Sequence, residues 1–147
     1  MILLFDTNIL LHFLRQSAVS KQVEADYDPF HPTNKLLLSI VSEGEIRSIA
    51  IQSNWGIKRM QALESELLDF AVIPIRSKDI IHRYAEIDAY SQNRMAGRPL
   101  PMTARNMSKN DLWIAATVSI LSAKLLTTDN DFDHLDGVYL DLAKIKV

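Results

Sequence analysis

The chain has 147 residues, 48% of them hydrophobic, and contains no cysteine. This length fits one domain over residues 1–147, and the lack of cysteine excludes disulfides, thiol catalysis and thiolate metal sites. The formal net charge of −2 predicts no strong overall attraction to nucleic acid, so any such contact must come from a local basic patch. No apolar run reaches the roughly 18–20 residues of a membrane-spanning helix, and Asp6 comes too early for a signal peptide, so we expect a cytoplasmic protein without membrane contact.

The first half of the chain alternates apolar runs with helical patterns. Residues 2–5 are all apolar, which is typical of a strand buried on both faces, and a helical spacing follows directly after Asp6. The next expected elements are a helix over 17–25, a loop over 27–34, a strand over 35–41, a helix from Ser42 to a break at Trp55, and a helix over 57–70.

The second half continues this alternation. Its expected elements are a strand over 71–75, a helix over 77–96, a loop over 97–107, a helix over 109–122 capped by Ser108, a strand over 124–127, and a fifth strand over 138–140. Strands that alternate with helices predict an α/β fold, with a mostly parallel sheet of four to five strands and helices on both faces.

Four acidic residues stand at the ends of these expected elements. Asp6 and Asp129 directly follow strands, whereas Glu45 and Asp111 lie in the first turns of the helices that begin after residues 41 and 108. The carboxyl ends of parallel strands meet at one edge of a sheet, and the helix before the fourth strand must begin at that edge. We therefore expect the four carboxylates to converge.

Each acid also has a purely structural explanation. Asp6 can cap a helix, Glu45 and Asp111 each complete a capping box with a serine three residues earlier, and Asp129 fits a turn. Capping does not explain why all four would share one edge of the sheet. Clustered carboxylates repel one another, and a hard divalent cation such as Mg²⁺ or Mn²⁺ removes that repulsion and can activate water for attack on a phosphodiester.

Four segments carry a recognisable combination of motifs. Together they resemble the PIN-domain nucleases, and most closely the VapC-type toxins of bacterial and archaeal toxin–antitoxin pairs: Phe5–Asn8, Ser42–Ile46, Asn110–Ala116 and Leu126–Phe132. The resemblance extends from Ile2 to about Leu140. It implies a three-layer α/β fold with strand order 3-2-1-4-5 and a Mg²⁺- or Mn²⁺-dependent endoribonuclease. It also implies a homodimer and a small antitoxin protein that holds the enzyme inactive.

The same resemblance implies roles for individual residues. The acidic set that would bind metal and catalyse RNA cleavage is Asp6, Glu45, Asp111 and Asp129, with Asp131 as a candidate fifth ligand. The residues that would orient carboxylates or water are Thr7 or Asn8, and Thr127 or Thr128. Glu43 is a rival to Glu45, which is preferred because it directly precedes the apolar Ile46, as in the family motif.

Basic residues gather shortly before Asp111 and form the best candidate for a patch that contacts RNA phosphates. They are Arg94, Arg98, Arg105 and Lys109. A solvated basic loop explains them equally well. The expected loops over 27–34 and 97–107 look longer than in the most compact family members, and both could border the substrate groove, which leaves the choice of RNA open.

Two other functions compete with the nuclease hypothesis. The first is a PIN-like RNA-binding or scaffold module that has kept its acids but has little catalytic activity. The second is a receiver-type phosphoryl-transfer protein, which also has an acid after its first strand. That class normally places a lysine after a later strand, whereas Lys124 begins the fourth strand here, so the match is poor.

Overall fold

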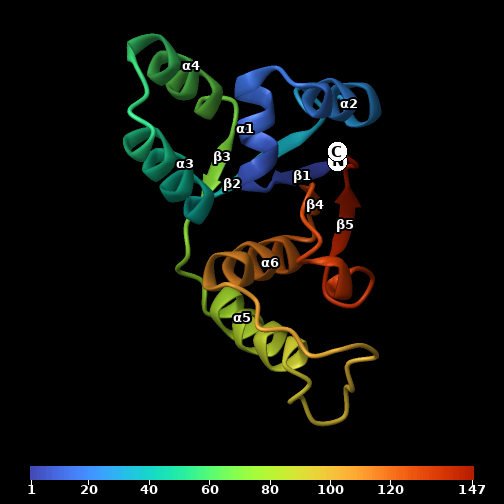
Figure 1. The fold of residues 1–147 in the computed structure, drawn as a ribbon. Coiled ribbons are helices and arrows are strands. Elements are labelled where there is room, and N and C mark those ends of the chain that lie inside the picture. Colours follow the sequence, from blue (N-terminus) through green and yellow to red (C-terminus); the bar gives the residue numbers. More distant parts are fainter.

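The computed structural model describes all 147 residues, and its central feature is a five-stranded parallel sheet between two layers of helices (Figure 1). The elements in chain order are β1 (Ile2–Phe5), α1 (Thr7–Arg15), α2 (Ala18–Tyr27), β2 (Lys35–Ser39), α3 (Ile40–Gln52), α4 (Ile57–Leu67), β3 (Ala71–Ile73), α5 (Lys78–Ser91), α6 (Lys109–Leu121), β4 (Lys124–Thr127), the 3₁₀ helix η1 (Asp133–Leu135) and β5 (Asp141–Lys144). The strand order is β3-β2-β1-β4-β5, and every pairing is parallel. The predicted α/β class and strand order are therefore confirmed.

The two faces of the sheet bury separate hydrophobic cores. Successive side chains of a strand point to opposite faces, so Leu3 and Phe5 pack on the side of α1 to α4, whereas Leu4 packs on the side of α5 and α6. All three side chains are completely buried. This double burial explains why β1 is an uninterrupted apolar run, and it places β1 at the centre of the sheet (Figure 1).

The register of the sheet determines which residues meet at its carboxyl edge. Phe5 pairs with Leu38 of β2 and with Leu126 of β4. The residues that follow these three positions therefore lie side by side, and the Asp6 N–H donates to the Leu126 carbonyl at 3.0 Å. The central strands thus bring the start of α1, the start of α3 and the segment after β4 to one place.

The structure corrects the expected start of the third helix. Strand β2 ends at Ser39, whose hydroxyl accepts a hydrogen bond from the Val41 N–H at 3.1 Å and so caps α3. Ser42 therefore lies inside the helix and is buried, and the expected capping box with Glu45 does not form. Both Ser39 and Ser42 are N-cap residue types, and the strand register decides between them.

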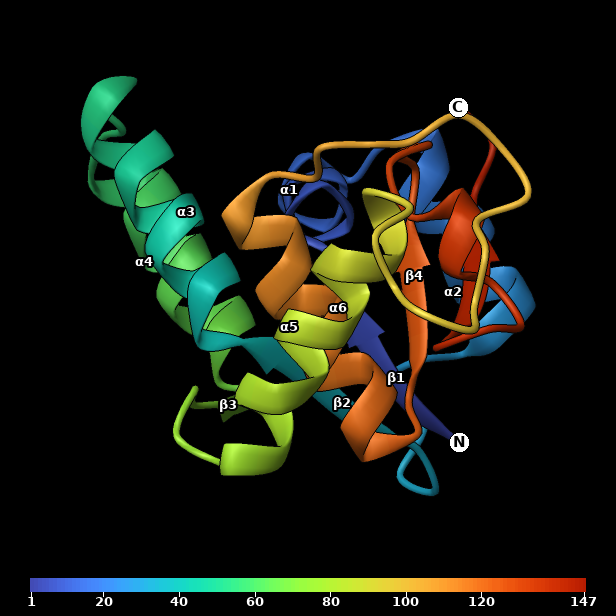
Figure 2. The ribbon, with the colours of Figure 1, turned by 90° about the horizontal axis from the view of Figure 1, so that it is seen from below.

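Several other boundaries differ from those expected, among them the end of α4, which is at Leu67 and not at residue 70. Strand β3 ends at Ile73, and α5 ends at Ser91, just before Asn93 takes a left-handed conformation with a φ of 56°. The fifth strand is Asp141–Lys144, because residues 138–140 follow a turn at Gly137 with a φ of 73°, and Tyr139 and Leu140 are buried in the core. The long segment between α5 and α6 extends across to the β4–β5 side of the molecule (Figure 2).

None of the helices combines the length and the apolar character that crossing a bilayer would require.

Candidate metal-binding site

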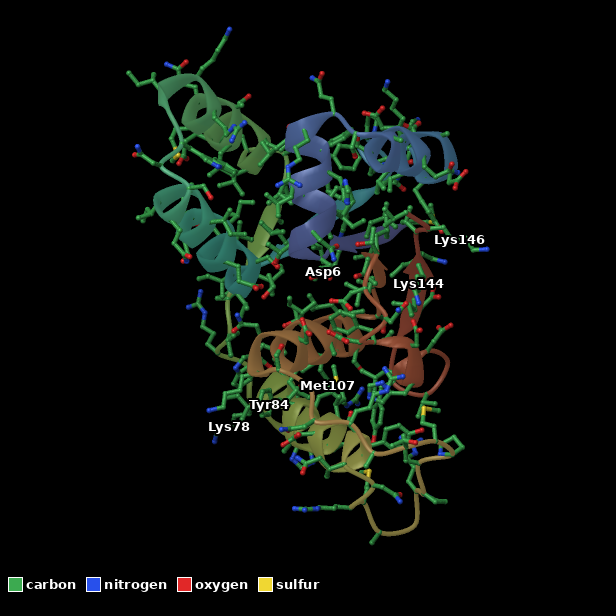
Figure 3. The ribbon with its side chains drawn as sticks, in the orientation of Figure 1. Asp6, Lys78, Tyr84, Met107, Lys144 and Lys146 are labelled. Carbon is green, nitrogen blue, oxygen red and sulfur yellow. The ribbon has the colours of Figure 1, made fainter.

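Asp6 is the most buried residue of the acidic group and lies at the start of α1 (Figure 3). Only 5% of the residue is exposed. One carboxylate oxygen accepts the Thr7 N–H at 2.8 Å and caps α1, and the other accepts the Thr127 hydroxyl at 2.7 Å. Burial raises the pKa of Asp6 to about 6 against the effect of these hydrogen bonds, and the nearby charges of Glu45 and Asp129 raise it further.

The Thr127 hydroxyl connects the end of β1 to the turn after β4. It donates to Asp6 and accepts the Asp129 N–H at 3.0 Å. Asp129 in turn accepts the Asp131 N–H at 3.1 Å through its Oδ1 atom. One continuous chain of hydrogen bonds therefore runs from Asp6 to the backbone of Asp131, and it explains how the turn is oriented toward the sheet edge.

Asp111 reaches the same place from the first turn of α6. The Ser108 hydroxyl caps this helix by accepting the Asp111 N–H at 3.2 Å, as the sequence predicts. Burial raises the pKa of Asp111 to about 7, the charge of Asp6 adds to the rise, and a hydrogen bond with Ser108 opposes it. Burial and the Asp129 charge also raise the pKa of Asp131. Burial is the largest cause of all three raised pKa values, and the repulsion between the neighbouring carboxylates adds to it.

Three of the carboxylates are close enough to share one ion. Asp111, Asp129 and Asp131 each offer an oxygen atom, and these oxygens all lie within 4.8 Å of one another. No ion pair of the structure involves any of the acids gathered here, so no lysine or arginine neutralises them directly. An all-oxygen, anionic donor set without a cationic partner has the chemistry that Mg²⁺ and Mn²⁺ prefer.

The sequence matches the PIN domain family over residues 3–138, which is nearly the whole chain. The chain belongs to the PIN domain family. This span includes every acidic residue of the site described above, so the cluster lies inside the PIN domain. No curated protein sequence matches the chain closely enough to count as a relative.

Solved structures show the same fold over essentially the full length. VapBC2 from Rickettsia felis bound to a DNA fragment from its promoter is 18% identical, with a TM-score of 0.78, and the match covers 99% of this chain and 100% of that one. VapBC-1 from nontypeable Haemophilus influenzae is 22% identical, with a TM-score of 0.73 and 98% of each chain covered. FitAcB from Neisseria gonorrhoeae is 25% identical, with a TM-score of 0.69, and covers 97% of this chain and 96% of its own.

Of the two rival glutamates of this PIN domain, only Glu45 faces the acidic group. Its Oε1 atom lies 2.9 Å from the Thr7 hydroxyl, which is also 2.9 Å from the Ser42 hydroxyl. A carboxylate can only accept, so the single Thr7 proton goes to Glu45 and Ser42 donates to Thr7. Glu43 instead pairs with Arg47 at 3.0 Å on the neighbouring side of α3.

The two remaining polar residues of the expected set have no comparable contacts. The Asn8 Oδ1 atom is buried without a hydrogen-bond partner, and Thr128 is half-buried with no side-chain hydrogen bond. Within the pairs that the sequence left open, Thr7 and Thr127 are therefore the residues whose hydroxyls bond to the acids.

The structure separates the four basic residues expected to contact RNA. Arg98 lies over the Tyr139 ring, 4.8 Å from its centre, and Arg105 donates to the Asn130 carbonyl at 3.0 Å. Arg94 and Lys109 are exposed and have no side-chain hydrogen bond. Motif reasoning did not anticipate the contact between Arg105 and Asn130, because the two residues are 25 positions apart and belong to no shared sequence pattern.

Proposed function

We propose that this PIN domain is a Mg²⁺- or Mn²⁺-dependent endoribonuclease, and that it is the VapC-type toxin of a toxin–antitoxin pair. One observation carries the proposal: carboxylates from four separate segments gather at the carboxyl edge of the sheet, and three of them come within 4.8 Å of one another. PIN domains are generally nucleases, and most of the length-matched structures described above are VapBC complexes, which supports the same conclusion.

The chemistry follows from what each residue does. Asp111, Asp129 and Asp131 would hold the ion with Asp6 beside them, and the bound ion would supply water activation and charge stabilisation for cleavage of an RNA phosphodiester. Thr127 fixes Asp6 relative to Asp129, and Thr7 fixes Glu45. Exposed Lys109, two residues before Asp111, and exposed Arg94 and Arg98 are candidate cations for RNA phosphates, because none of the three has a side-chain hydrogen bond.

Chelation tests the nuclease directly. Purified protein should cleave single-stranded or structured RNA with Mg²⁺, EDTA should stop the cleavage, and added Mn²⁺ should restore it. The Asp111→Asn variant, purified in the same way, should not cleave, which excludes a contaminating ribonuclease. Cleavage that survives thorough chelation would end the metal hypothesis, whereas RNA binding without cleavage would favour the scaffold alternative.

The antitoxin would bind beside α1. A hollow of about 350 Å³ lies between α1 and the start of α4, and it is lined by Leu11, Leu14, Arg15, Trp55, Arg59 and Ala62. The Arg59 guanidinium covers the Trp55 ring, 5.3 Å from its centre. An apolar floor with two arginines suits a segment that has both apolar and acidic side chains.

The genome offers the matching test of the partner. We expect a short gene for a DNA-binding protein immediately upstream, and its product should copurify with this chain and suppress its RNA cleavage. Leu14→Glu should weaken copurification at least about tenfold, because it buries a carboxylate in the hollow, while the free variant still cleaves RNA. Copurification that is unaffected by Leu14→Glu would place the partner on another surface.

The homodimer that the resemblance implies is part of the same proposal, and the mass of the purified protein in solution tests it.

A further inference from the structure

The segment between α5 and α6 is tied to the turn that carries Asp129 and Asp131. Its residue Arg105 is fixed at the backbone, because the Arg105 N–H donates to the Ser91 carbonyl at 2.7 Å. Two residues later, Met107 is buried and its sulfur lies 3.3 Å from the Ser91 hydroxyl. The end of α5 therefore fixes where the Arg105 side chain begins.

From this position the Arg105 side chain reaches the peptide between Asn130 and Asp131. Its Nη1 atom donates to the Asn130 carbonyl at 3.0 Å, and the N–H of the same peptide donates to Asp129 Oδ1 at 3.1 Å. The Asn130 carbonyl also accepts the Asp133 N–H at 3.2 Å. Hydrogen bonds on both sides therefore fix the rotation of this peptide plane.

The orientation of that peptide decides where two carboxylates lie. Asp131 supplies the nitrogen of this peptide and Asp129 precedes Asn130, and both carboxylates contribute oxygens to the group that lies within 4.8 Å, together with Asp111. Asp131 is exposed, so packing does little to hold it against the repulsion of the Asp111 and Asp129 carboxylates. The hydrogen bonds of the turn therefore hold Asp131 in place.

We propose that Arg105 is a positioning residue: by bonding to the Asn130 carbonyl it holds the turn in the conformation in which Asp129 and Asp131 can bind the ion together with Asp111. This inference rests on the proposed metal-dependent function. It gives Arg105 a role that does not involve RNA, in contrast to the phosphate contact expected from the sequence. Residues that orient ligands in this way commonly contribute strongly to metal affinity.

Positioning and electrostatics predict opposite effects of removing Arg105 on the affinity for the metal ion. Arg105 is a cation close enough to Asp131 to lower the pKa of that carboxyl. Its charge therefore also repels a divalent ion, and Coulomb forces alone predict tighter metal binding once it is gone. If Arg105 acts by positioning, its removal must instead weaken metal binding.

The experiment measures Mn²⁺ binding by electron paramagnetic resonance in the absence of RNA. We expect Arg105→Ala to raise the Mn²⁺ dissociation constant by about 3–10-fold, below the range typical of buried ligand-orienting partners because Arg105 is only half-buried. Arg105→Lys keeps the charge and an N–H donor group but not the reach of the guanidinium, so its dissociation constant should fall between those of wild type and Arg105→Ala. Lys58→Ala, which removes an exposed cation of α4, should leave the constant unchanged.

The outcomes separate the two proposals. Wild-type protein that binds no Mn²⁺ would overturn the proposed function and this inference with it. Wild-type protein that binds Mn²⁺, with equal or tighter binding in Arg105→Ala, would overturn the inference alone. A raised KM for RNA with unchanged Mn²⁺ affinity would also overturn it and would assign Arg105 to phosphate binding. Thermal unfolding of each metal-free variant shows whether the fold is intact.

Discussion

Asp6→Asn is expected to reduce RNA cleavage more than about 100-fold while making the metal-free protein more stable at pH 7.5. The loss should exceed that typical of ligand-orienting residues, because Asp6 is itself one of the clustered carboxylates. The gain in stability follows from the pKa of Asp6, which is about 6 and well above the ordinary value of 3.8. The fold therefore disfavours the charged form, which predominates at pH 7.5.

Two opposing contributions determine how much Asp6→Asn raises the free energy of unfolding. A rise of roughly 2 pKa units corresponds to about 3 kcal/mol between the charged and neutral forms. Asparagine keeps the oxygen that caps α1, since asparagine and aspartate cap about equally well, but it loses one of the two acceptor oxygens and with it the bond from Thr127. That bond offsets about 1–2 kcal/mol, so we expect a net increase of about 1–2 kcal/mol in the free energy of unfolding.

Urea denaturation and single-turnover cleavage measure the two effects on the same preparation. Asp79→Asn is the matched control, because it removes an exposed carboxylate from the first turn of α5 and should change stability by less than about 0.5 kcal/mol. If Asp6→Asn lost stability along with activity, the Asp6 carboxylate would act mainly as a structural acceptor of the Thr127 hydrogen bond, and the lost cleavage would no longer support its place in the catalytic set.

The positions of the acids along the chain were predictable because they follow from strand ends. The all-apolar strand that ends before Asp6 and the strand Lys124–Thr127 that ends before Asp129 are enough to place these side chains at one edge once the sheet is parallel. The helix cap at Ser108 was equally predictable, since the start of a helix depends on residues close in sequence.

Thr7 and Thr127 were among the residues expected to orient carboxylates, but the partners that hold each acid in place were not predictable. Thr7 meets Glu45 and Ser42 only because α1 and α3 pack side by side, and Arg105 meets Asn130 only through the path of the segment between α5 and α6. The start of α3 was misplaced for the same reason, because strand pairing and not local sequence selects the cap. Asp131, expected only as a candidate fifth ligand, is in the closest triplet because the turn folds back on itself.

The metal-free protein should lose stability as the pH rises from 5.5 to 7.5, and Mn²⁺ should reverse this trend. Asp6 and Asp111 have folded-state pKa values of about 6 and about 7, above their ordinary value of 3.8. Between pH 4 and 7 the folded state therefore holds more protons than the unfolded state, so their contribution to stability falls as the pH rises through this window.

His134 changes the pH dependence of stability in the opposite direction, so its contribution has to be separated from that of the acids. The residue is only 3% exposed, its Nε2 atom lies 2.7 Å from the Ser91 hydroxyl, and burial lowers its pKa to about 4. A histidine with a lowered pKa destabilises the fold as the pH falls below about 6.5. The double variant Asp6→Asn/Asp111→Asn keeps His134, so the difference between wild type and this variant isolates the contribution of the acids.

Divalent ions compete with protons for the same carboxylates, so their effect must grow with pH. At pH 7.5 and Mn²⁺ at 100 times its dissociation constant, binding adds about 2.7 kcal/mol, which for a chain of this size raises Tm by roughly 5–10 °C. At pH 5.5 with the same Mn²⁺ concentration the rise should be less than about half as large, because Asp6 and Asp111 are then mostly protonated. Thermal unfolding of chelator-treated protein, with and without Mn²⁺, measures both shifts, and the double variant should show neither. An equal Mn²⁺ shift at the two pH values, or one that persists in the double variant, would mean that the ion binds away from the clustered acids.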